Sequence, residues 1–266
     1  QRLKQDGSQL ANEWLDLGID RKATKKVTMT YNYGLTPYSA RKYVEEYIEE
    51  LREKGKKIVW GDDLFMPSRF LANHLWEAIA ENIKAAPKLM GWLQEFARLV
   101  ARNGKSMCWT TPSGFYVKQD YPQLEDRRVK TKIGDSIIAV TTKREGPEGQ
   151  INRRKQVNSI VANYIHSLDA AALHISVNTA VEYGIKDFAL IHDSYGVHAA
   201  DVELMNEIIR KVFVEMYKRE DLLEKFKKDV IKLAGLRKST HNQIPAMLEK
   251  GNLDLDEVNQ SDYFFA

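Results

Sequence analysis

Hydrophobic residues recur at helical spacing through most of the first hundred positions of the chain. This pattern predicts helices over Ser8–Leu17, Arg21–Tyr33, Tyr38–Lys54 and Pro67–Arg102. Gly34 follows the second of these helices and is typical of the left-handed residue that ends a helix, and Pro87 is expected to interrupt the fourth. The first part of the chain is therefore expected to be helical.

From Met107 onward the spacing changes to that of β-strands. It predicts strands over Met107–Thr111, Gly114–Lys118 and Val129–Thr142, the last folding back on itself at Gly134 as a hairpin. Helical spacing then returns over Asn158–Tyr183, Val202–Arg219 and Asp221–Ala234. Between the first two of these helices we expect a buried strand, Phe188–Ile191, a tight turn, and a returning strand, Tyr195–Ala199.

Together these elements predict an α+β fold in which helices predominate. We expect a helical region, 1–105, and then a mixed region, 106–266, that carries a hairpin at about 127–143 and an apolar C-terminal tail. With 266 residues, 43% of them apolar, the chain is long enough to bury a sizeable core.

The overall charge says little about partners. The chain has 40 Lys and Arg against 37 Asp and Glu, a net charge of +3, so a nucleic-acid surface would have to come from clustering. Cys108 is the single cysteine, which excludes an internal disulfide and a cysteine zinc site. No apolar run is long enough to cross a bilayer, so no membrane partner is expected. The start at Gln1 instead of Met indicates a trimmed chain or a fragment.

Four side chains recur at intervals of four on the second predicted helix: Arg21, Lys25, Met29 and Tyr33. Four residues advance about 400° around a helix, so these side chains lie along one stripe. Two cations, a thioether and a phenol suit a nucleoside triphosphate, with the phosphates on the cations and the base against Met29. Spacing alone nevertheless favours an ordinary solvated basic face.

A carboxylate occupies the tight turn between the two late strands. Asp193, held there rigidly, can present both oxygens to a hard cation, as phosphoryl transfer requires. Taken alone, His-Asp-Ser is more typical of an ordinary turn aspartate. Likewise, a lone helical histidine such as His166 is more typical of a structural residue.

Three segments resemble motifs of one family. Arg21–Gly34 matches R-x-x-x-K-x-x-x-M-x-x-x-Y-G, Asn163–Asp169 is similar to N-F-V-H-S-x-D, and Ala189–Gly196 contains H-D-S-Y-G. They resemble the fingers helix and the palm of bacteriophage-type single-subunit RNA polymerases, in the same order. The resemblance extends from about Leu10 to Ala266 and implies the fingers and palm subdomains of a right-hand polymerase.

The resemblance implies a nucleotidyltransferase that adds ribonucleoside triphosphates to an RNA 3′ end on a DNA template, by phosphoryl transfer with two Mg²⁺ ions. It implies that Arg21 and Lys25 contact the triphosphate and that Tyr33, followed by Gly34, closes the pocket beside the ribose. His166 would form a hydrogen bond with the 2′-hydroxyl of the incoming nucleotide, and Asp193 would bind a metal ion. The aromatic tail, with Phe265 and Ala266, is expected near the active site.

One metal ligand of the family has no counterpart in this chain. The family holds its ions with two aspartates, and the second lies on a palm strand well before the fingers helix. Only 20 residues precede Arg21, and their acids lie in helix and loop patterns. The resemblance therefore implies a second polymerase polypeptide that supplies the aspartate, the N-terminal domain and the thumb, as a heterodimer in the cytoplasm of an infected bacterial host. A fragment of one longer chain is the other reading.

Two other classes of protein stay open. A fragment of a related DNA polymerase is disfavoured by Met29, His166 and Ser194, and a non-catalytic nucleic-acid-binding protein could retain a polymerase-like fold. The hairpin adds a further ambiguity. In the family a hairpin at this place reads promoter DNA, but the cations here match that pattern poorly, and a soluble edge hairpin is an equal interpretation: Arg127, Arg128, Lys130, Lys132 and Lys143.

Overall fold

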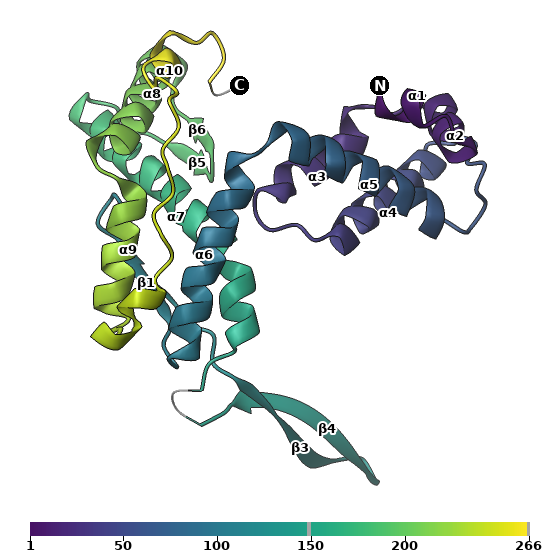
Figure 1. Cartoon of the computed structure of the whole chain (residues 1–266), viewed down its shortest axis with the longest axis horizontal. Coiled ribbons are helices and arrows are strands. Elements are labelled where there is room, and N and C mark those ends of the chain that lie inside the picture. Colours follow the sequence, from purple (N-terminus) through teal and green to yellow (C-terminus); the bar gives the residue numbers. More distant parts are fainter. Residues whose placement is uncertain (148–149, 265–266) are drawn as a thin grey trace. The chain divides into compact units, whose positions relative to one another are not determined.

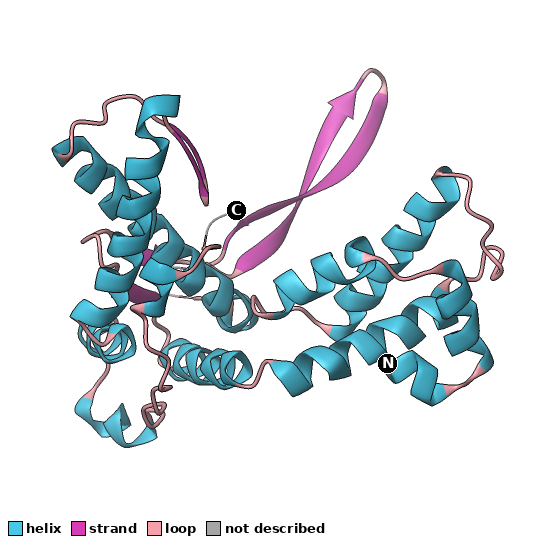
Figure 2. Ribbon diagram, turned by 90° about the horizontal axis from the view of Figure 1, so that it is seen from above, coloured by secondary structure: helices cyan, strands magenta, loops and turns pink. Residues whose placement is uncertain are grey.

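The computed structural model describes residues 1–147 and 150–264 (Figure 1). Its contacts separate into two compact units, Gln1–Gly91 and Trp92–Ala266, each with a core of its own. Helices dominate both units (Figure 2), so the helix-rich α+β class expected from the sequence is confirmed. Within the described ranges, no helix has both the length and the apolar character needed to cross a membrane.

The first unit consists of short and medium helices. They are α1 (Arg2–Asp6), α2 (Gln9–Leu17), α3 (Arg21–Tyr31), α4 (Pro37–Glu53) and α5 (Phe65–Asn82). Polar residues begin three of these helices: the side chains of Ser8, Asp20 and Thr36 each accept a hydrogen bond from a backbone N–H of the first turn. Capping therefore explains why the helical pattern begins at these positions.

The core of the first unit gathers one face from each of α2, α3, α4 and α5. Trp14 is fully buried and its indole N–H donates to the Pro67 carbonyl over 3.1 Å, which joins α2 to the start of α5. Val27 of α3 and Ile48 of α4 are also fully buried. Because Ala23, Val27 and Tyr31 face this core, the opposite face of α3 is left to solvent.

The sequence predicts a helix break at Pro87, but the structure has the break earlier in the chain. Helix α5 ends at Asn82 and α6 (Ala85–Arg102) begins three residues later, so the chain changes direction at Ile83-Lys84. Pro87 lies in the first turn of α6, where its missing N–H leaves no helical hydrogen bond unmade. The unpredicted helix α1 is only five residues long, too short for a clear hydrophobic period.

The second unit mixes helices with small antiparallel sheets. After α6 come β1 (Met107–Thr110), β2 (Tyr116–Gln119), β3 (Leu124–Ile133), β4 (Ser136–Glu145), α7 (Arg153–Glu182), β5 (Ala189–Ile191), β6 (Ser194–Gly196), α8 (Val202–Arg219), α9 (Leu222–Leu233) and α10 (Glu257–Gln260). Two 3₁₀ turns, Ala199–Asp201 and Lys238–Gln243, complete the order. Strands pair β1 with β2, β3 with β4 and β5 with β6.

An aromatic cluster forms much of the core of the second unit. The ring of Phe226 on α9 lies 4.5 Å from that of Tyr164 on α7 and 5.7 Å from that of Trp109 on β1. The Trp109 indole N–H donates to Ser167 Oγ over 2.9 Å, inside the core. Helix α7 is thereby fixed at the residue next to His166.

The late hairpin differs from its prediction in burial. Its strands are short, and Ile191, expected in a buried strand, is 71% exposed. Leu190 and Tyr195 are half-buried, because alternate residues of a strand face opposite ways and the described elements cover one face only. The prediction of a buried strand over Phe188–Ile191 is therefore wrong.

Candidate functional site

Three members of the predicted nucleotide stripe lie on the solvent face of α3. Arg21, Lys25 and Met29 are exposed, and Met29 shows 55% of its surface, a large exposed fraction for a thioether side chain. At the helix start, Asp20 Oδ1 accepts from the backbone N–H groups of Lys22 and Ala23 at 2.8 and 3.2 Å. This cap holds the first turn, where Arg21 projects.

The cations of α3 fall into two groups. Lys26 is engaged by α4: its ammonium lies 2.9 Å from Glu46 Oε2, and that hydrogen bond raises the pKa of Lys26. Among the described residues, Arg21 and Lys25 form no ion pair within 4.0 Å. The stripe side of the helix thus presents unneutralised positive charge, whereas the neighbouring side is neutralised internally.

Tyr33 and Gly34 lie just beyond the regular helix. Helix α3 ends at Tyr31, two residues earlier than predicted, and the chain closes with hydrogen bonds from Gly34 N to Tyr31 O and from Leu35 N to Thr30 O. Gly34 has a φ of 91°, so its predicted role as a left-handed helix terminator is confirmed. Half-buried Tyr33 is thus positioned by a rigid terminating turn.

Asp193 lies exposed on the two-residue turn between β5 and β6, which pair through Ile191 and Ser194. The preceding His192 has a φ of 52°, and among the described residues it is the one non-glycine with positive φ. Such a conformation is unfavourable for a residue with a Cβ and is found disproportionately at functional sites. The ends of the hairpin are joined by His198 Nε2 and Asp187 Oδ2 at 3.4 Å.

Helix α7 brings two more polar side chains into the electrostatic environment of Asp193. His166 and Asp169 are three residues apart and share a helix face. Desolvation raises the pKa of the Asp169 carboxyl, the charge of Asp193 raises it further, and His166 acts in the opposite direction. His166 and Asp193 thus both act on the charge of Asp169.

Two tyrosines complete this environment. Burial raises the pKa of Tyr217 on α8 to about 12, with a further contribution from the charge of Asp169. Burial also raises the pKa of Tyr195 on β6, and the charges of Asp169 and Asp193 add to it. Five side chains are related by these electrostatic effects, and we name the set the palm cluster after the resemblance: His166, Asp169, Asp193, Tyr195 and Tyr217.

Asp169 was not singled out from the sequence. The sequence feature that could have identified Asp169 is its position three residues after His166. Residues three apart on a helix lie on the same side, so both side chains share one helix face. Its relation to Asp193 could not be seen, because the two residues belong to different elements. The palm cluster is thus larger than the predicted pair.

Buried hydrogen bonds fix the helix that carries His166. The Gln119 side-chain amide on β2 donates to Gln156 Oε1 at 2.7 Å, and Gln156 returns a bond to the Gln119 carbonyl at 2.8 Å. Asn163, one turn before His166, donates to Gln119 Oε1 at 2.9 Å. Together with the Trp109–Ser167 bond, these contacts hold α7 in place along the turns that precede the palm cluster.

The C-terminal segment docks on α8. Phe264 packs on Phe213 with ring centroids 4.8 Å apart, and the Arg210 guanidinium lies 5.9 Å from the Phe264 ring. Arg210 also donates to the carbonyls of Val258 and Ser261. Phe264 belongs to the same hydrophobic cluster as Tyr195. The predicted near-site residues Phe265 and Ala266 lie outside the described residues.

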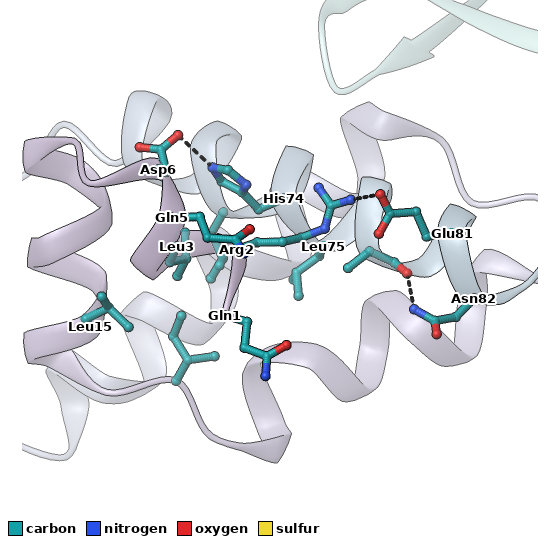
Figure 3. Close-up of a pocket in the computed structure, with 13 residues that line it drawn as sticks. Gln1, Arg2, Leu3, Gln5, Asp6, Leu15, His74, Leu75, Glu81 and Asn82 are labelled. Carbon is teal, nitrogen blue, oxygen red and sulfur yellow. Dashed lines mark hydrogen bonds and ion pairs between the residues drawn. The ribbon is translucent and has the colours of Figure 1, made fainter.

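A large cavity is lined by other residues. It measures about 870 Å³, lies in the first unit and is lined by α1, α2 and α5 (Figure 3). Asp6 and His74 approach to 3.5 Å there, and Arg2 pairs with Glu81, so α1 is fastened to α5 across it. None of the predicted site residues lines this cavity.

The palm cluster fits a hard divalent cation in part. Asp193 offers an exposed carboxylate, whose oxygens are hard ligands of the kind that Mg²⁺ prefers. In the described part of the chain, no three His, Cys, Asp or Glu side chains gather in a metal-binding arrangement.

Comparison with known proteins supports the resemblance. A family model described as DNA-dependent RNA polymerase matches residues 1–243. The chain is 34% identical to the mitochondrial DNA-directed RNA polymerase 1B of Nicotiana tabacum, over 93% of the chain and 23% of that protein. It is 30% identical to T7 RNA polymerase of Escherichia phage T7, over 100% of the chain and 31% of that protein.

The DNA-directed RNA polymerase of Enterobacteria phage K11 is 31% identical, over 97% of the chain and 30% of its own length. The chain thus spans about a quarter to a third of the curated relatives that it matches. All three relatives are RNA polymerases by name, and the matching family model describes RNA polymerases, which contradicts the alternative of a DNA polymerase fragment. The family match and the similarity to these relatives over nearly the whole chain lead to one conclusion: the chain belongs to the phage-type DNA-dependent RNA polymerase family.

Proposed function

We propose that this chain is the fingers and palm portion of a DNA-dependent RNA polymerase, which joins ribonucleoside triphosphates to an RNA 3′ end. The observation that carries the proposal is Asp193, exposed on a strained two-residue turn and coupled electrostatically to the face of α7 that bears His166. Because the chain belongs to the polymerase family, we assign this carboxylate to the binding of a metal ion that phosphoryl transfer requires.

In the first unit, α3 would bind the incoming nucleotide. Arg21 and Lys25 present positive charge on its exposed face for the triphosphate, and exposed Met29 offers an apolar surface for the base. Tyr33 and Gly34, in the turn that ends α3, would close the pocket beside the ribose. A phosphate contact carries no base information, so this binding serves all four nucleotides alike.

In the second unit, the palm cluster would perform the chemistry. Asp193 would hold Mg²⁺, and His166 would hydrogen-bond the ribose 2′-hydroxyl and so favour ribonucleotides. Mg²⁺, when bound, would neutralise charge on the attacking and leaving oxygens. The protein itself would hold these side chains in place. Buried hydrogen bonds fix α7, which carries His166, and a short turn fixes Asp193.

The remainder of the enzyme would come from outside these 266 residues. The relatives are three to four times longer, and the proposed two-metal site needs a further carboxylate. We assign that carboxylate, the thumb and the N-terminal domain to a second polypeptide, with which this chain would act on DNA template and RNA product. The phage origin of some relatives supports a proposed location in the cytoplasm of an infected bacterium, whereas the plant relatives are organellar by name.

The test is RNA synthesis by the chain together with the polymerase polypeptide that co-purifies with it, with Asp193→Asn as the variant. The substitution keeps the side-chain shape and removes the charge, so the rate should fall at least about 100-fold while assembly persists. Asp187→Asn is the matched control, because Asp187 flanks the same hairpin but lies at its open end. A variant that kept more than about a tenth of the rate, a loss below ~1.4 kcal/mol, would show that Asp193 is not a metal ligand.

The same assay separates the alternatives. No synthesis by any preparation, with DNA binding intact, would favour the non-catalytic nucleic-acid-binding protein. Robust synthesis by the purified chain alone would contradict the second polypeptide.

A further inference from the structure

A hydrogen-bonded network of four polar side chains joins β2 and the residues after it to α7. The side chains are Gln119 at the end of β2, Tyr121 just after it, and Gln156 and Asn163 on α7. Gln119 and Gln156 are buried, with 4% and 0% of their surfaces exposed. A buried amide must form its hydrogen bonds within the protein, so these two side chains have defined orientations.

The direction of each hydrogen bond follows from the amide at the centre of the network. Gln119 Nε2 donates to the Gln156 carbonyl at 2.8 Å and to Gln156 Oε1 at 2.7 Å, which uses both of its hydrogens. Gln156 Nε2 donates in return to the Gln119 carbonyl at 2.8 Å. Gln119 Oε1 can therefore only accept, and it accepts from Asn163 Nδ2 at 2.9 Å.

The amide of Asn163 is held from two directions. Its Nδ2 group lies 2.9 Å from Gln119 Oε1 and 3.0 Å from the Tyr121 hydroxyl, so both of its hydrogens have acceptors. Tyr121 is itself held against the first turn of α7. Its carbonyl accepts from the backbone N–H of Asn152 at 2.8 Å, and the Lys155 ammonium lies 4.5 Å from its ring centroid.

The network ends beside the histidine that we assign to the ribose. Asn163 and His166 are three residues apart on α7 and share a helix face, on which His166 is exposed and Asn163 is half-buried. Just after His166, Ser167 accepts from the Trp109 indole inside the core at 2.9 Å. The turn that carries His166 is thus bonded to neighbouring elements immediately before and immediately after it.

We propose that Asn163 and Tyr121 are positioning residues for His166, and that through it they determine the preference for ribonucleotides over deoxynucleotides. This inference rests on the proposed function, in which His166 forms a hydrogen bond with the 2′-hydroxyl. Such a bond weakens steeply as its distance and angle depart from their optimum, so a small displacement of the turn removes it. Residues that fix the turn therefore contribute to the choice of sugar without contacting the nucleotide.

The test is competitive incorporation of a ribonucleotide against its deoxy counterpart by the chain together with the second polypeptide proposed above. Asn163→Asp keeps the side-chain shape but places carboxylate oxygens against Gln119 Oε1, which can only accept. The preference for the ribonucleotide should fall at least about fivefold, through a higher KM for the ribonucleotide alone. Tyr121→Phe removes one hydrogen bond and should lower the preference at least about twofold. Tyr116→Phe, at an exposed tyrosine of β2, is the matched control and should leave it unchanged.

A double-mutant cycle separates positioning from a general loss of structure. In a His166→Ala background, Asn163→Asp should change the preference no further, because the group that it positions is absent. Additive effects of the two substitutions would overturn the proposal, as would an unchanged preference in both Asn163→Asp and Tyr121→Phe. Equal losses for the two sugars, together with a lower melting temperature, would mean that the network serves stability only.

The same measurements distinguish failure of this inference from failure of the proposed function. If no preparation synthesises RNA, or if His166→Ala leaves the preference unchanged, the role assigned to His166 fails and the inference fails with it. If His166→Ala lowers the preference while the Asn163 and Tyr121 variants retain it, the positioning inference alone is wrong.

Discussion

At the scale of single residues, the turn that presents Asp193 combines strain with exposed charge. His192 holds a positive φ that would suit glycine, at a cost on the order of 1–3 kcal/mol. Burial raises the pKa of the Asp169 carboxyl, and the charge of Asp193 raises it further. The strain at His192 and the raised pKa of Asp169 both oppose folding at neutral pH, and perturbed groups of this kind are found disproportionately at functional sites.

Asp169→Asn tests this arrangement through stability. Because folding raises the carboxyl pKa above its ordinary value of 3.8, folding favours the protonated form. That contribution is present in full below pH 3.8 and is lost as the pH rises through the raised folded pKa. In magnesium-free buffer at pH 7, the variant should therefore melt at a higher temperature than the wild type.

The gain should shrink as the pH falls and should vanish below about pH 3, where the carboxyl is neutral in both states. Melting curves followed by circular dichroism across this range provide the measurement. A variant that melts lower at pH 7 would mean that Asp169 is stabilised by an interaction stronger than its repulsion from Asp193.

Tyr33→Phe addresses the choice of sugar. The phenol oxygen is the only atom removed, so packing of the half-buried ring should survive. If the hydroxyl belongs to a network around the 2′-hydroxyl, its loss should lower the preference for ribonucleotides at least several-fold, for a hydrogen bond worth about 0.5–1.5 kcal/mol. Competitive incorporation of a ribonucleotide against its deoxy counterpart measures this. Tyr38→Phe, at an exposed tyrosine of the same unit, should leave discrimination unchanged.

At the scale of elements, α3 shows how local chemistry positions a binding surface. Its buried residues recur every four positions, and this recurrence leaves the Arg21–Lys25–Met29 stripe outward. Its start is defined by the two hydrogen bonds to Asp20, and its end by the bonds around Gly34. Hydrogen bonds therefore define both ends of the helix that carries the stripe.

Asp20→Ala should destabilise the first unit by about 1 kcal/mol, because it leaves two first-turn N–H groups without their cap. It should also weaken nucleotide use, since Arg21 would then lie on a frayed turn. Asp20→Asn preserves a good cap and should lose only a few tenths of a kcal/mol. Urea unfolding of the two variants provides the comparison, and equal losses would contradict the capping argument.

At the scale of the whole molecule, chemistry is divided between two separately packed units. The candidate nucleotide helix belongs to the core built around Trp14 and Ile48. The palm cluster lies in the second unit, on α7, α8 and the β5–β6 hairpin, and α7 packs in the Trp109–Phe226 aromatic core. The chain spans less than a third of T7 RNA polymerase. We therefore expect activity to be a property of the assembled polymerase, and each activity test includes the second polypeptide proposed above.

Much of this protein was determined by its sequence alone. Helices α2 and α4, the terminating Gly34 and the hairpin turn at Gly134 follow from capping residues, apolar spacing and positive-φ glycines, all of which act over a few neighbouring residues. The family itself was recognisable from three short motifs, because each combines residue types and spacings that ordinary surfaces rarely combine.

Only the tertiary structure decided the rest. It exposed Ile191 where an apolar run predicted burial, because burial depends on which elements cover a face and not on the residues of the strand. It also coupled Asp169 to Asp193, and joined Asn163 of α7 to Gln119 and Tyr121. These properties arise between residues distant in the chain, and local patterns carry no information on such distances.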